Sequence, residues 1–293
     1  MATVLARLPE RQLAPLLSAY AAATRARQVR TLIVLAIMGV CVCLAWNNAG
    51  VDLERLWDGI ERFTSYFDRL FKLDSGARVW TDPGEWLWGW SRWLRLLGDT
   101  ILIAYVGTVL GAAGAFLLCF AAARNLDRAP WLRFSIRRFL EFCRTVPDLV
   151  FALVFVVAFG LGPVPGVLAI AIHSLGALGK LFFEIVENID MAPVSGLQST
   201  GASFPLTVRF AVVPQVLASF ASYALLRFEI NVRGATVMGF VGAGGIGQDL
   251  IESIRKFYYA DVSAILVMIV IAVFALDIAT ERLRRGLTNE PRR

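Results

Sequence analysis

The sequence predicts an all-α integral membrane protein with about six transmembrane helices. Hydrophobic residues make up 57% of the 293-residue chain, and the mean hydropathy is +0.64. A soluble domain usually has about 45–50% apolar residues. The excess lies in continuous runs close to the roughly 20 residues that cross a bilayer core as a helix. Arginines gather beside the first and the last of these runs.

Six apolar runs are long enough to be predicted as spans. They cover residues 31–47, 99–123, 146–162, 164–183, 206–228 and 261–281. The sequence Gly-Pro-Val-Pro-Gly at 162–166 predicts a tight turn between the third and fourth spans. A signal peptide is the alternative for the first run, but the basic region before it is too long, so we interpret it as a span.

The spans divide the chain into four predicted segments. Residues 1–30 form a cytoplasmic amphipathic segment, and residues 31–98 hold the first span and a periplasmic segment that is amphipathic and then rich in tryptophan. Residues 99–286 form the core domain, with a loop at 187–205, and residues 287–293 form a cytoplasmic tail. The flanking arginines place both termini in the cytoplasm of a bacterial cell, with the chain as a multi-pass protein of the cytoplasmic (inner) membrane.

The composition argues against several functional classes. The net charge of +6 comes from arginines beside apolar runs and not from a basic face on a soluble helix, so nucleic-acid binding is not expected. One histidine and four scattered cysteines supply neither a structural zinc set nor a nucleophile with its base. No G-x-x-x-x-G-K-[ST] sequence occurs, so no P-loop is present. We expect a chain without enzyme activity, bound metal or bound cofactor.

A glycine-rich sequence at 242–247, Gly-Ala-Gly-Gly-Ile-Gly, matches the dinucleotide pattern G-x-G-x-x-G. A dinucleotide fold also needs a second strand with an acidic residue about 20 positions on, inside a βαβ unit. Here a membrane span follows instead. We therefore interpret the glycines as a flexible turn or a close helix contact.

The loop between the fourth and fifth spans predicts a short helix, a break and a new helix. Pro193 suits a first helical turn, Gly201 a left-handed position after a helix, and Ser203 an N-cap before the fifth span. A short cytoplasmic helix held between two spans is what a rigid docking element requires.

This loop resembles the cytoplasmic EAA loop of type I ABC-importer permeases, which has Glu-Ala-Ala, three residues, Gly, nine residues and Ile-x-Leu-Pro. The glycine-to-proline spacing is intact here, whereas Ser-Gly-Leu at 195–197 stands where Glu-Ala-Ala would be. The resemblance implies that coupling to an ATPase involves Ser195, Gly196, Leu197, Gly201, Ala202, Ser203 and Pro214.

Three further motifs resemble the phosphonate/phosphate/phosphite branch of that superfamily. They are Arg-Thr-Val-Pro-Asp at 144–148, Gly-Lys-Leu-Phe-Phe-Glu at 179–184, and Tyr-Ala-Leu-Leu-Arg-Phe-Glu-Ile-Asn-Val-Arg at 223–233, which leads into the glycines at 242–247. The resemblance covers about residues 50–286.

The resemblance implies a type I ABC-importer permease fold with a cytoplasmic coupling helix, and a path for phosphonate, phosphate or phosphite. It implies an extracytoplasmic (periplasmic) binding protein, two cytosolic ABC ATPase subunits that use ATP and Mg²⁺, and a second permease copy, in a homodimer or a pair of permeases. The alternatives are an importer of the same type for an amino acid or osmolyte, a secondary transporter, and a membrane-embedded transferase. The chain shows neither a clear inverted repeat nor a catalytic cluster, so the importer remains our prediction.

Lys180 and Glu184 put charges into the fourth span. Charges inside a membrane face protein or water because exposure to lipid costs roughly 2.5–3.5 kcal/mol or more. The two residues lie four apart and can pair. Two interpretations stay open: a structural ion pair near the cytoplasmic end, or a lining of the translocation path.

Arg227 and Asn231 lie four residues apart and share a helix face at the predicted outer end of the fifth span, with Glu229 and Arg233 close by. Arginine suits phosphate-like oxygens through charge-assisted hydrogen bonds. Three interpretations stay open for these residues: an ion-paired gate or scaffold around Glu229, a transient contact with the anion, or neither.

Overall fold

The computed structural model describes residues 10–50, 52–73, 75–126 and 129–288. Nearly all of these residues lie in helices, and an isolated β-bridge joins Lys72 to Arg78. The all-α prediction is confirmed. The chain divides into two compact units, Met1–Tyr66 and Phe67–Arg293, which are described separately.

The first unit contains α2 (Glu10–Asn48), a continuous helix of 39 residues. It runs without a break across residue 30, where the sequence analysis separated an N-terminal segment from the first span. Residues 17–48 are long and apolar enough to cross a membrane, and their side chains are almost all exposed, as in a helix surrounded by lipid. Residues 1–9 of the predicted segment lie outside the described residues.

Helix α3 (Leu53–Leu70) begins in the first unit and ends in the second. The Asp52 carboxylate caps its first turn by accepting from the backbone N–H of Glu54 at 3.0 Å and of Arg55 at 3.3 Å. Its apolar stripe, which the sequence predicted, includes the exposed Trp57 and Phe63.

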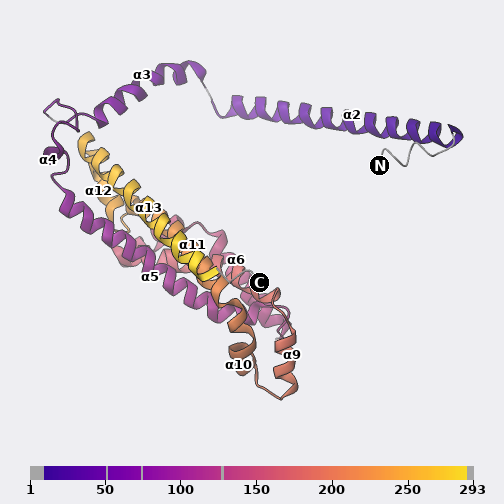
Figure 1. The fold of residues 1–293 in the computed structure, drawn as a ribbon. Coiled ribbons are helices and arrows are strands. Elements are labelled where there is room, and N and C mark those ends of the chain that lie inside the picture. Colours follow the sequence, from indigo (N-terminus) through magenta and orange to yellow (C-terminus); the bar gives the residue numbers. More distant parts are fainter. Residues whose placement is uncertain (1–9, 51, 74, 127–128, 289–293) are drawn as a thin grey trace. The chain divides into compact units, whose positions relative to one another are not determined.

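The second unit is a bundle of helices (Figure 1). The elements are α4 (Pro83–Trp86), α5 (Trp90–Ala122), α6 (Pro130–Thr145), α7 (Asp148–Phe159), α8 (Pro163–Glu187), α9 (Ala192–Ser199), α10 (Phe204–Thr207), the π-helical turn η1 (Val208–Val212), α11 (Val213–Met238), the 3₁₀ turn η2 (Gly239–Val241), α12 (Ile246–Arg255) and α13 (Tyr259–Thr288). Figure 1 shows α9 and α10 together at one end, which we call the α9 end.

Five described helical segments are long and apolar enough to cross a membrane: residues 17–48, 90–122, 163–187, 204–241 and 259–287. A bent pair, α6 and α7, makes a sixth if the two count as one span. Five of the six predicted spans therefore have a matching helix, and the third is represented by the bent pair.

The third predicted span, 146–162, is not a continuous transmembrane helix. Helix α7 has 12 residues, or about 18 Å at 1.5 Å per residue, against the roughly 30 Å of a bilayer core. It is bent by 86° from α6. The break falls at Val146, whose backbone is extended because the following Pro147 disfavours a helical conformation before it. The structure therefore has two helices, α6 and α7, with a sharp bend between them where the sequence predicted a cytoplasmic segment and a straight span.

Small residues let α8 pack closely against two neighbours. A Cβ at Gly111 of α5 would come within 2.7 Å of the Ala171 carbonyl oxygen of α8. A Cβ at Gly176 of α8 would come within 2.5 Å of the backbone nitrogen of Arg144 in α6. Close backbone approach at small residues is typical of helices packed inside membranes. Helix α8 therefore forms the centre of the second unit.

The glycines at 242–247 form a tight turn and a close helix contact, as the sequence analysis expected. Gly242, Gly244 and Gly245 have φ between +80° and +83°, where residues with a Cβ are strained. A Cβ on Gly247 would collide with the Thr236 carbonyl oxygen. The turn packs α12 against the end of α11.

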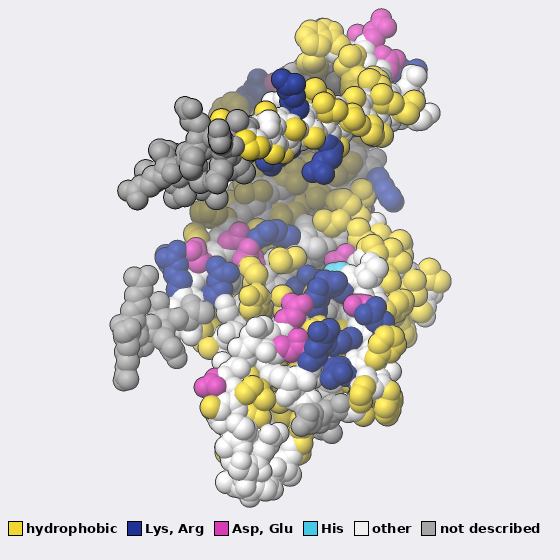
Figure 2. Space-filling view, turned by 90° about the vertical axis from the view of Figure 1, so that its right-hand side faces the viewer, with side chains coloured by type: hydrophobic (Ala, Val, Ile, Leu, Met, Phe, Trp, Pro, Cys, Tyr) yellow, Lys and Arg dark blue, Asp and Glu magenta, His cyan; other side chains and the backbone are white. Residues whose placement is uncertain are grey.

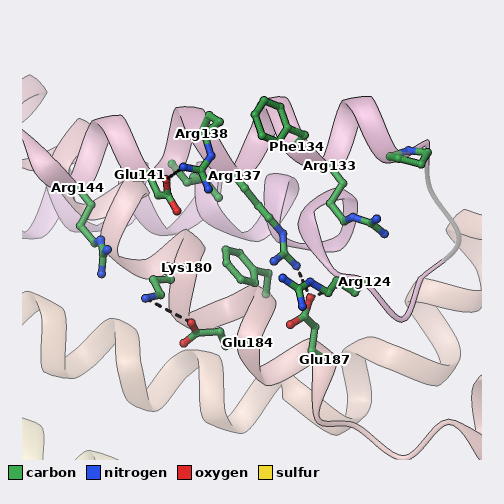
Figure 3. A pocket seen from close by; sticks show the side chains of 13 residues that line it. Arg124, Arg133, Phe134, Arg137, Arg138, Glu141, Arg144, Lys180, Glu184 and Glu187 are labelled. Carbon is green, nitrogen blue, oxygen red and sulfur yellow. Dashed lines mark hydrogen bonds and ion pairs between the residues drawn. The ribbon is translucent and has the colours of Figure 1, made fainter.

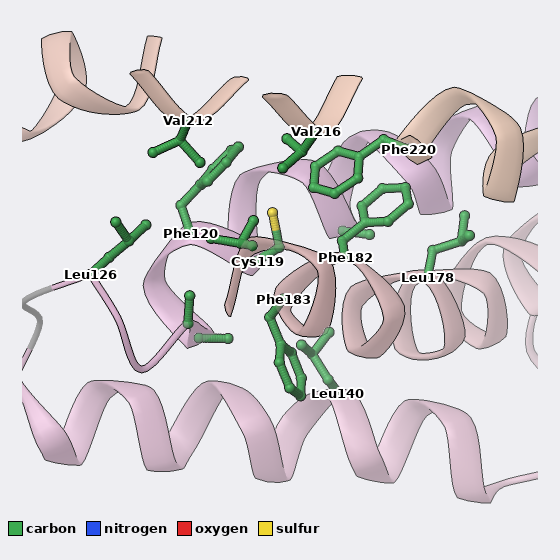
Figure 4. Close-up of a cluster of buried hydrophobic side chains, with 14 of the residues drawn as sticks. Cys119, Phe120, Leu126, Leu140, Leu178, Phe182, Phe183, Val212, Val216 and Phe220 are labelled. Atoms are coloured by element: carbon green, nitrogen blue, oxygen red, sulfur yellow. The ribbon is translucent and has the colours of Figure 1, made fainter. Parts of the chain in front are cut away.

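A buried hydrophobic cluster lies towards the α9 end of the second unit (Figure 4). Phe182 of α8 and Phe220 of α11 stack with ring centroids 3.9 Å apart. Val194 of α9 belongs to the same cluster and is 0% exposed. The short helix α9 is therefore anchored to the bundle by its own apolar side chain.

The predicted tryptophan cluster has two parts. Trp80, Trp88 and Trp90 are exposed, as expected at a membrane–water interface. Trp93 is buried, and the Trp88 Nε1 donates to Asp261 Oδ1 at 2.8 Å. The cluster therefore also holds the start of α5 against α13.

Candidate functional site

A polar cluster joins α5, α8 and α11 inside the bundle. Asn231 of α11 is 3% exposed, and its Nδ2 donates to Thr108 Oγ1 of α5 and to Ser174 Oγ of α8, both at 2.8 Å. Ser174 is 0% exposed and lies halfway along α8. The cluster therefore lies in the middle of three candidate spans, away from their ends.

Arg227 reaches the same serine from one turn earlier on α11. Its Nε donates to Ser174 Oγ at 3.3 Å, and its charge interacts with that of Asp148 at the start of α7. The guanidinium makes no other hydrogen bond or ion pair with the described residues. An arginine has five N–H donors, so most of the donors of this half-buried side chain have no protein acceptor.

His173 of α8 joins the helix break to this cluster. Its Nδ1 lies 3.1 Å from the carbonyl oxygen of Val146, the residue at which α6 ends. This contact therefore fixes the helix break to α8, at the residue next to Ser174.

The prediction that Arg227–Arg233 lies at the outer end of the fifth span is wrong. Helix α11 continues to Met238 and η2 to Val241, so these residues lie inside the helix, about level with the middle of α8. The helix tolerates these charges because each of them has a polar partner on another helix. The predicted shared face of Arg227 and Asn231 is confirmed, since both side chains contact Ser174.

Glu229 and Arg233 lie on a different side of α11 and face α13. They form an ion pair with each other, and Arg233 Nη2 also lies 3.2 Å from Asp277 Oδ1 of α13. Thr280 Oγ1 of α13 lies 3.5 Å from Glu229 Oε2. This arrangement clamps α11 to α13 and leaves Arg227 without a carboxylate on its own helix.

Lys180 and Glu184 pair at 3.6 Å along α8, as their spacing predicted. Both residues line a cavity of about 630 Å³ between α6 and α8, at the α9 end (Figure 3). They are not part of the cluster around Ser174. The structure therefore places this ion pair apart from Arg227 and Asn231.

The coupling residues predicted from the loop surround α9. Gly201 has φ +80° and follows the C-cap Thr200. The N–H of Gly201 donates to the Gln198 carbonyl at 2.9 Å and that of Ala202 to the Leu197 carbonyl at 3.3 Å. This is the Schellman pattern that ends a helix, so the predicted left-handed position is confirmed.

The other predicted coupling residues are mostly on the surface. Ser195 and Gly196 are exposed on α9, and Leu197 is half-buried. Ser203 occupies the N-cap position of α10, but its side chain makes no capping hydrogen bond. Pro214 is exposed in the first turn of α11, directly after the π-helical turn. The loop thus presents a small polar surface on a well-anchored helix.

Sequence reasoning missed Thr108, Asp148 and Ser174 as members of the cluster. For Thr108 and Ser174, the only clue was a hydroxyl group inside an apolar span. For Asp148, the clue was the preceding Pro147, which indicates a helix break. Among residues 10–50, 52–73, 75–126 and 129–288, no group of three or more His, Cys, Asp or Glu could hold a metal ion.

Comparison with known proteins places this arrangement in a family. Residues 115–292 match the family described as binding-protein-dependent transport system inner membrane component. The chain is 35% identical over 249 residues to the phosphite transport system permease protein PtxC of Stutzerimonas stutzeri, covering 85% of this chain and 86% of that protein.

Two further similarities agree with this match. The chain is 36% identical over 239 residues to the phosphate-import permease protein PhnE of Mycolicibacterium smegmatis, covering 81% of this chain and 42% of that protein. The structure resembles a chain of the MetNI methionine ABC transporter in an inward-facing conformation, with a TM-score of 0.58, 19% identity, and coverage of 71% of this chain and 99% of that chain. The fold is thus that of a type I ABC-importer permease, and the chain belongs to the family of binding-protein-dependent transport system inner membrane components.

Proposed function

We propose that this chain is the permease subunit of an ABC importer and forms the translocation path for phosphite, phosphate or a phosphonate. The relatives named for phosphite and phosphate transport support this class of solute. The proposal includes a periplasmic binding protein that delivers the anion, two cytosolic ATPase subunits that hydrolyse ATP, and a second permease copy.

The observation that carries the proposal is Arg227. Its guanidinium lies midway along the bundle with most of its donors free of protein acceptors. A charged group in this position is expensive unless it faces protein, water or a ligand. Its fork of donors matches the oxygens of a phosphorus oxyanion. Ser174, which also accepts from Asn231, accepts from the Arg227 side chain and orients it.

The proposed path follows the surface of α11 and α8 that carries Arg227, beside the bend between α6 and α7. Alternating access requires parts of a permease to move relative to one another. The extended residue at Val146 and the short helix α7 offer such a moving part. His173 and Asp148 would then connect movement of the bend to the arginine that contacts the anion.

We further propose that α9 is the coupling helix and contacts the ATPase. Val194 fixes α9 to the hydrophobic cluster, while Ser195 and Gly196 are exposed. Motion imposed on the exposed side would therefore reach α8 and α11 through packed side chains. In this orientation the α9 end faces the cytoplasm and both termini are cytoplasmic.

The experiment that tests the proposal is uptake by the reconstituted importer with Arg227→Gln. Hydrogen bonds to charged groups are worth about 1.5–3 kcal/mol, so the half-saturating concentration of loaded binding protein should rise about tenfold or more. Arg227→Lys keeps the charge but lacks the fork and should give an intermediate rise. Arg282→Gln, which removes an exposed arginine of α13, is the matched control. Unchanged uptake by Arg227→Gln at normal expression would contradict the proposed contact.

A further inference from the structure

The cavity between α6 and α8 at the α9 end is strongly basic. Its volume is about 630 Å³, within the range of about 300–1,000 Å³ common for ligand pockets. The basic residues that line it are Arg124, Arg133, Arg137, Arg138, Arg144 and Lys180. Figure 3 shows these side chains coming from α6, from the end of α8 and from the segment after α5.

Three ion pairs neutralise the three carboxylates among the described residues of the cavity lining. Arg137 pairs with Glu187, Arg138 with Glu141 at 2.6 Å, and Lys180 with Glu184 at 3.6 Å. These pairs use three of the six cations. The remaining surplus of positive charge belongs to the other three arginines.

Arg137 has a structural role, unlike the three arginines of the lining that form no ion pair with described residues. Its Nε and Nη2 donate to the Ala122 carbonyl at 2.8 and 2.7 Å, and its guanidinium lies 4.4 Å from the centre of the Phe183 ring. All of these contacts fix the end of α5 to α6 and α8. A ligand would gain little from a side chain whose donors are already engaged.

The guanidinium groups of Arg124, Arg133 and Arg144 have no hydrogen-bond or ion-pair partner among the described residues. Arg133 is half-buried, and Figure 3 shows it on the same side of the cavity as Arg124, with Arg144 on the far side. Like charges without counter-charges repel. A cavity that keeps such a surplus suits an anion. Arginine forks bind phosphate oxygens through paired, charge-assisted hydrogen bonds.

We propose that this cavity binds a phosphate-type oxyanion through Arg124 and Arg133, at the end of the cavity away from Arg144 (Figure 3). The site differs from the proposed contact at Arg227, because it uses other residues at the α9 end. Two sources could supply the same group. One is a free anion, and the other is the headgroup of an anionic phospholipid.

A feature of α6 makes the lipid source physically reasonable. Trp131, Phe134, Phe139 and Phe142 are exposed on this helix, and aromatic side chains of this kind lie at membrane interfaces. In the second unit, Figure 2 shows basic and acidic side chains gathered on one face beside hydrophobic side chains. A lipid could therefore place its tails on the aromatic surface and its headgroup in the cavity.

The test measures binding by the intact chain, purified without its partners in phosphate-free maltoside detergent. Inorganic phosphate is titrated by calorimetry at constant ionic strength, with chloride as the reference anion. In a second arm, native mass spectrometry compares retention of phosphatidylglycerol with that of phosphatidylcholine. Arg124→Gln and Arg133→Gln should each weaken binding of phosphate, of phosphatidylglycerol or of both by about tenfold or more.

The matched control is the double variant Arg138→Gln/Glu141→Gln, which removes a pair from the same cavity without changing its net charge. It should bind like the unaltered chain. Loss of phosphate binding in the arginine variants assigns the site to a free anion, and loss of selective phosphatidylglycerol retention assigns it to a lipid. The proposal is overturned if neither ligand binds selectively, or if Arg124→Gln and Arg133→Gln bind normally. Because no transport is measured, this result is independent of the solute proposed above.

Discussion

Replacing Ser174 by alanine tests whether its hydroxyl positions Arg227. The Ser174 Oγ accepts hydrogen bonds from Asn231 at 2.8 Å and from Arg227 at 3.3 Å, and the substitution removes both. Side-chain hydrogen bonds between membrane helices contribute about 0.6 kcal/mol each. We therefore expect the free energy of unfolding to fall by about 1.2 kcal/mol, which leaves the protein folded. Thermal unfolding of the purified chain measures this loss.

The effect on transport should come through Arg227. Without Ser174 Oγ the guanidinium loses its hydrogen bond to the protein, so it is less often aimed at the anion. The half-saturating concentration of loaded binding protein should rise in Ser174→Ala, but by less than in Arg227→Gln. Because the serine acts through the arginine, the double variant should match Arg227→Gln alone.

Thr108→Ala is the matched control for this prediction. It removes one acceptor of Asn231, at 2.8 Å, and no contact of Arg227. We expect a loss of about 0.6 kcal/mol in the free energy of unfolding and normal uptake. The positioning role is refuted if the effects of Ser174→Ala and Arg227→Gln on uptake add, or if Ser174→Ala is destabilised while its uptake is normal.

Three further predictions concern coupling, the α11–α13 clamp and energy supply. Gly201→Val should insert normally but reduce uptake and ATPase stimulation, because a β-branched residue is strained at φ +80°. The control is Gly286→Ala near the end of α13, where an added Cβ meets nothing within 4 Å, and normal transport by Gly201→Val would exclude a coupling role. Arg233→Gln should lower the melting temperature more than Glu229→Gln, because Arg233 also reaches Asp277 of α13 at 3.2 Å. Equal melting temperatures for these two variants would contradict the proposed clamp between α11 and α13. The purified chain alone should show no ATP hydrolysis in a phosphate-release assay, and turnover abolished by a substitution in this chain would contradict the assignment of ATPase activity to a partner.

Hydropathy predicted the number of spans because apolar runs and helix length are both local properties. It failed at the third span, where α6 carries arginines and reads as a cytoplasmic segment. The arginines of α6 lie beside α8, and Arg137 pairs with Glu187 of that helix. Hydropathy could not predict this ion pair, because its two partners belong to different helices. The one local signal was Pro147, which disfavours a helical conformation at Val146.

The candidate site was predictable in part. The four-residue spacing of Arg227 and Asn231 predicted a shared face, and both side chains do meet at Ser174. Their depth was not predictable, because a hydropathy window ends at a charge whether or not that charge has partners on other helices. Thr108 and Ser174 come from helices far away in the sequence, so only the packing of α5, α8 and α11 brings them together.

The sequence of the coupling loop predicted its backbone geometry but not how its helix is anchored. The positive φ of Gly201 and the helical turn at Pro193 follow from the backbone limits of these two residue types. The burial of Val194 depends on the cluster formed by α5, α8 and α11, so no local pattern around it could predict that α9 is anchored.

Transport by proteoliposomes that contain this chain with its ATPase and binding protein tests the central claim most directly. Uptake of phosphite, phosphate and a small alkylphosphonate is measured with ATP, without ATP and with a protonophore. The account predicts that at least one phosphorus oxyanion accumulates, that ATP is required, and that the protonophore has no effect. Accumulation of an amino acid or osmolyte with none of the three anions, or uptake that needs a proton gradient and no ATP, would contradict it.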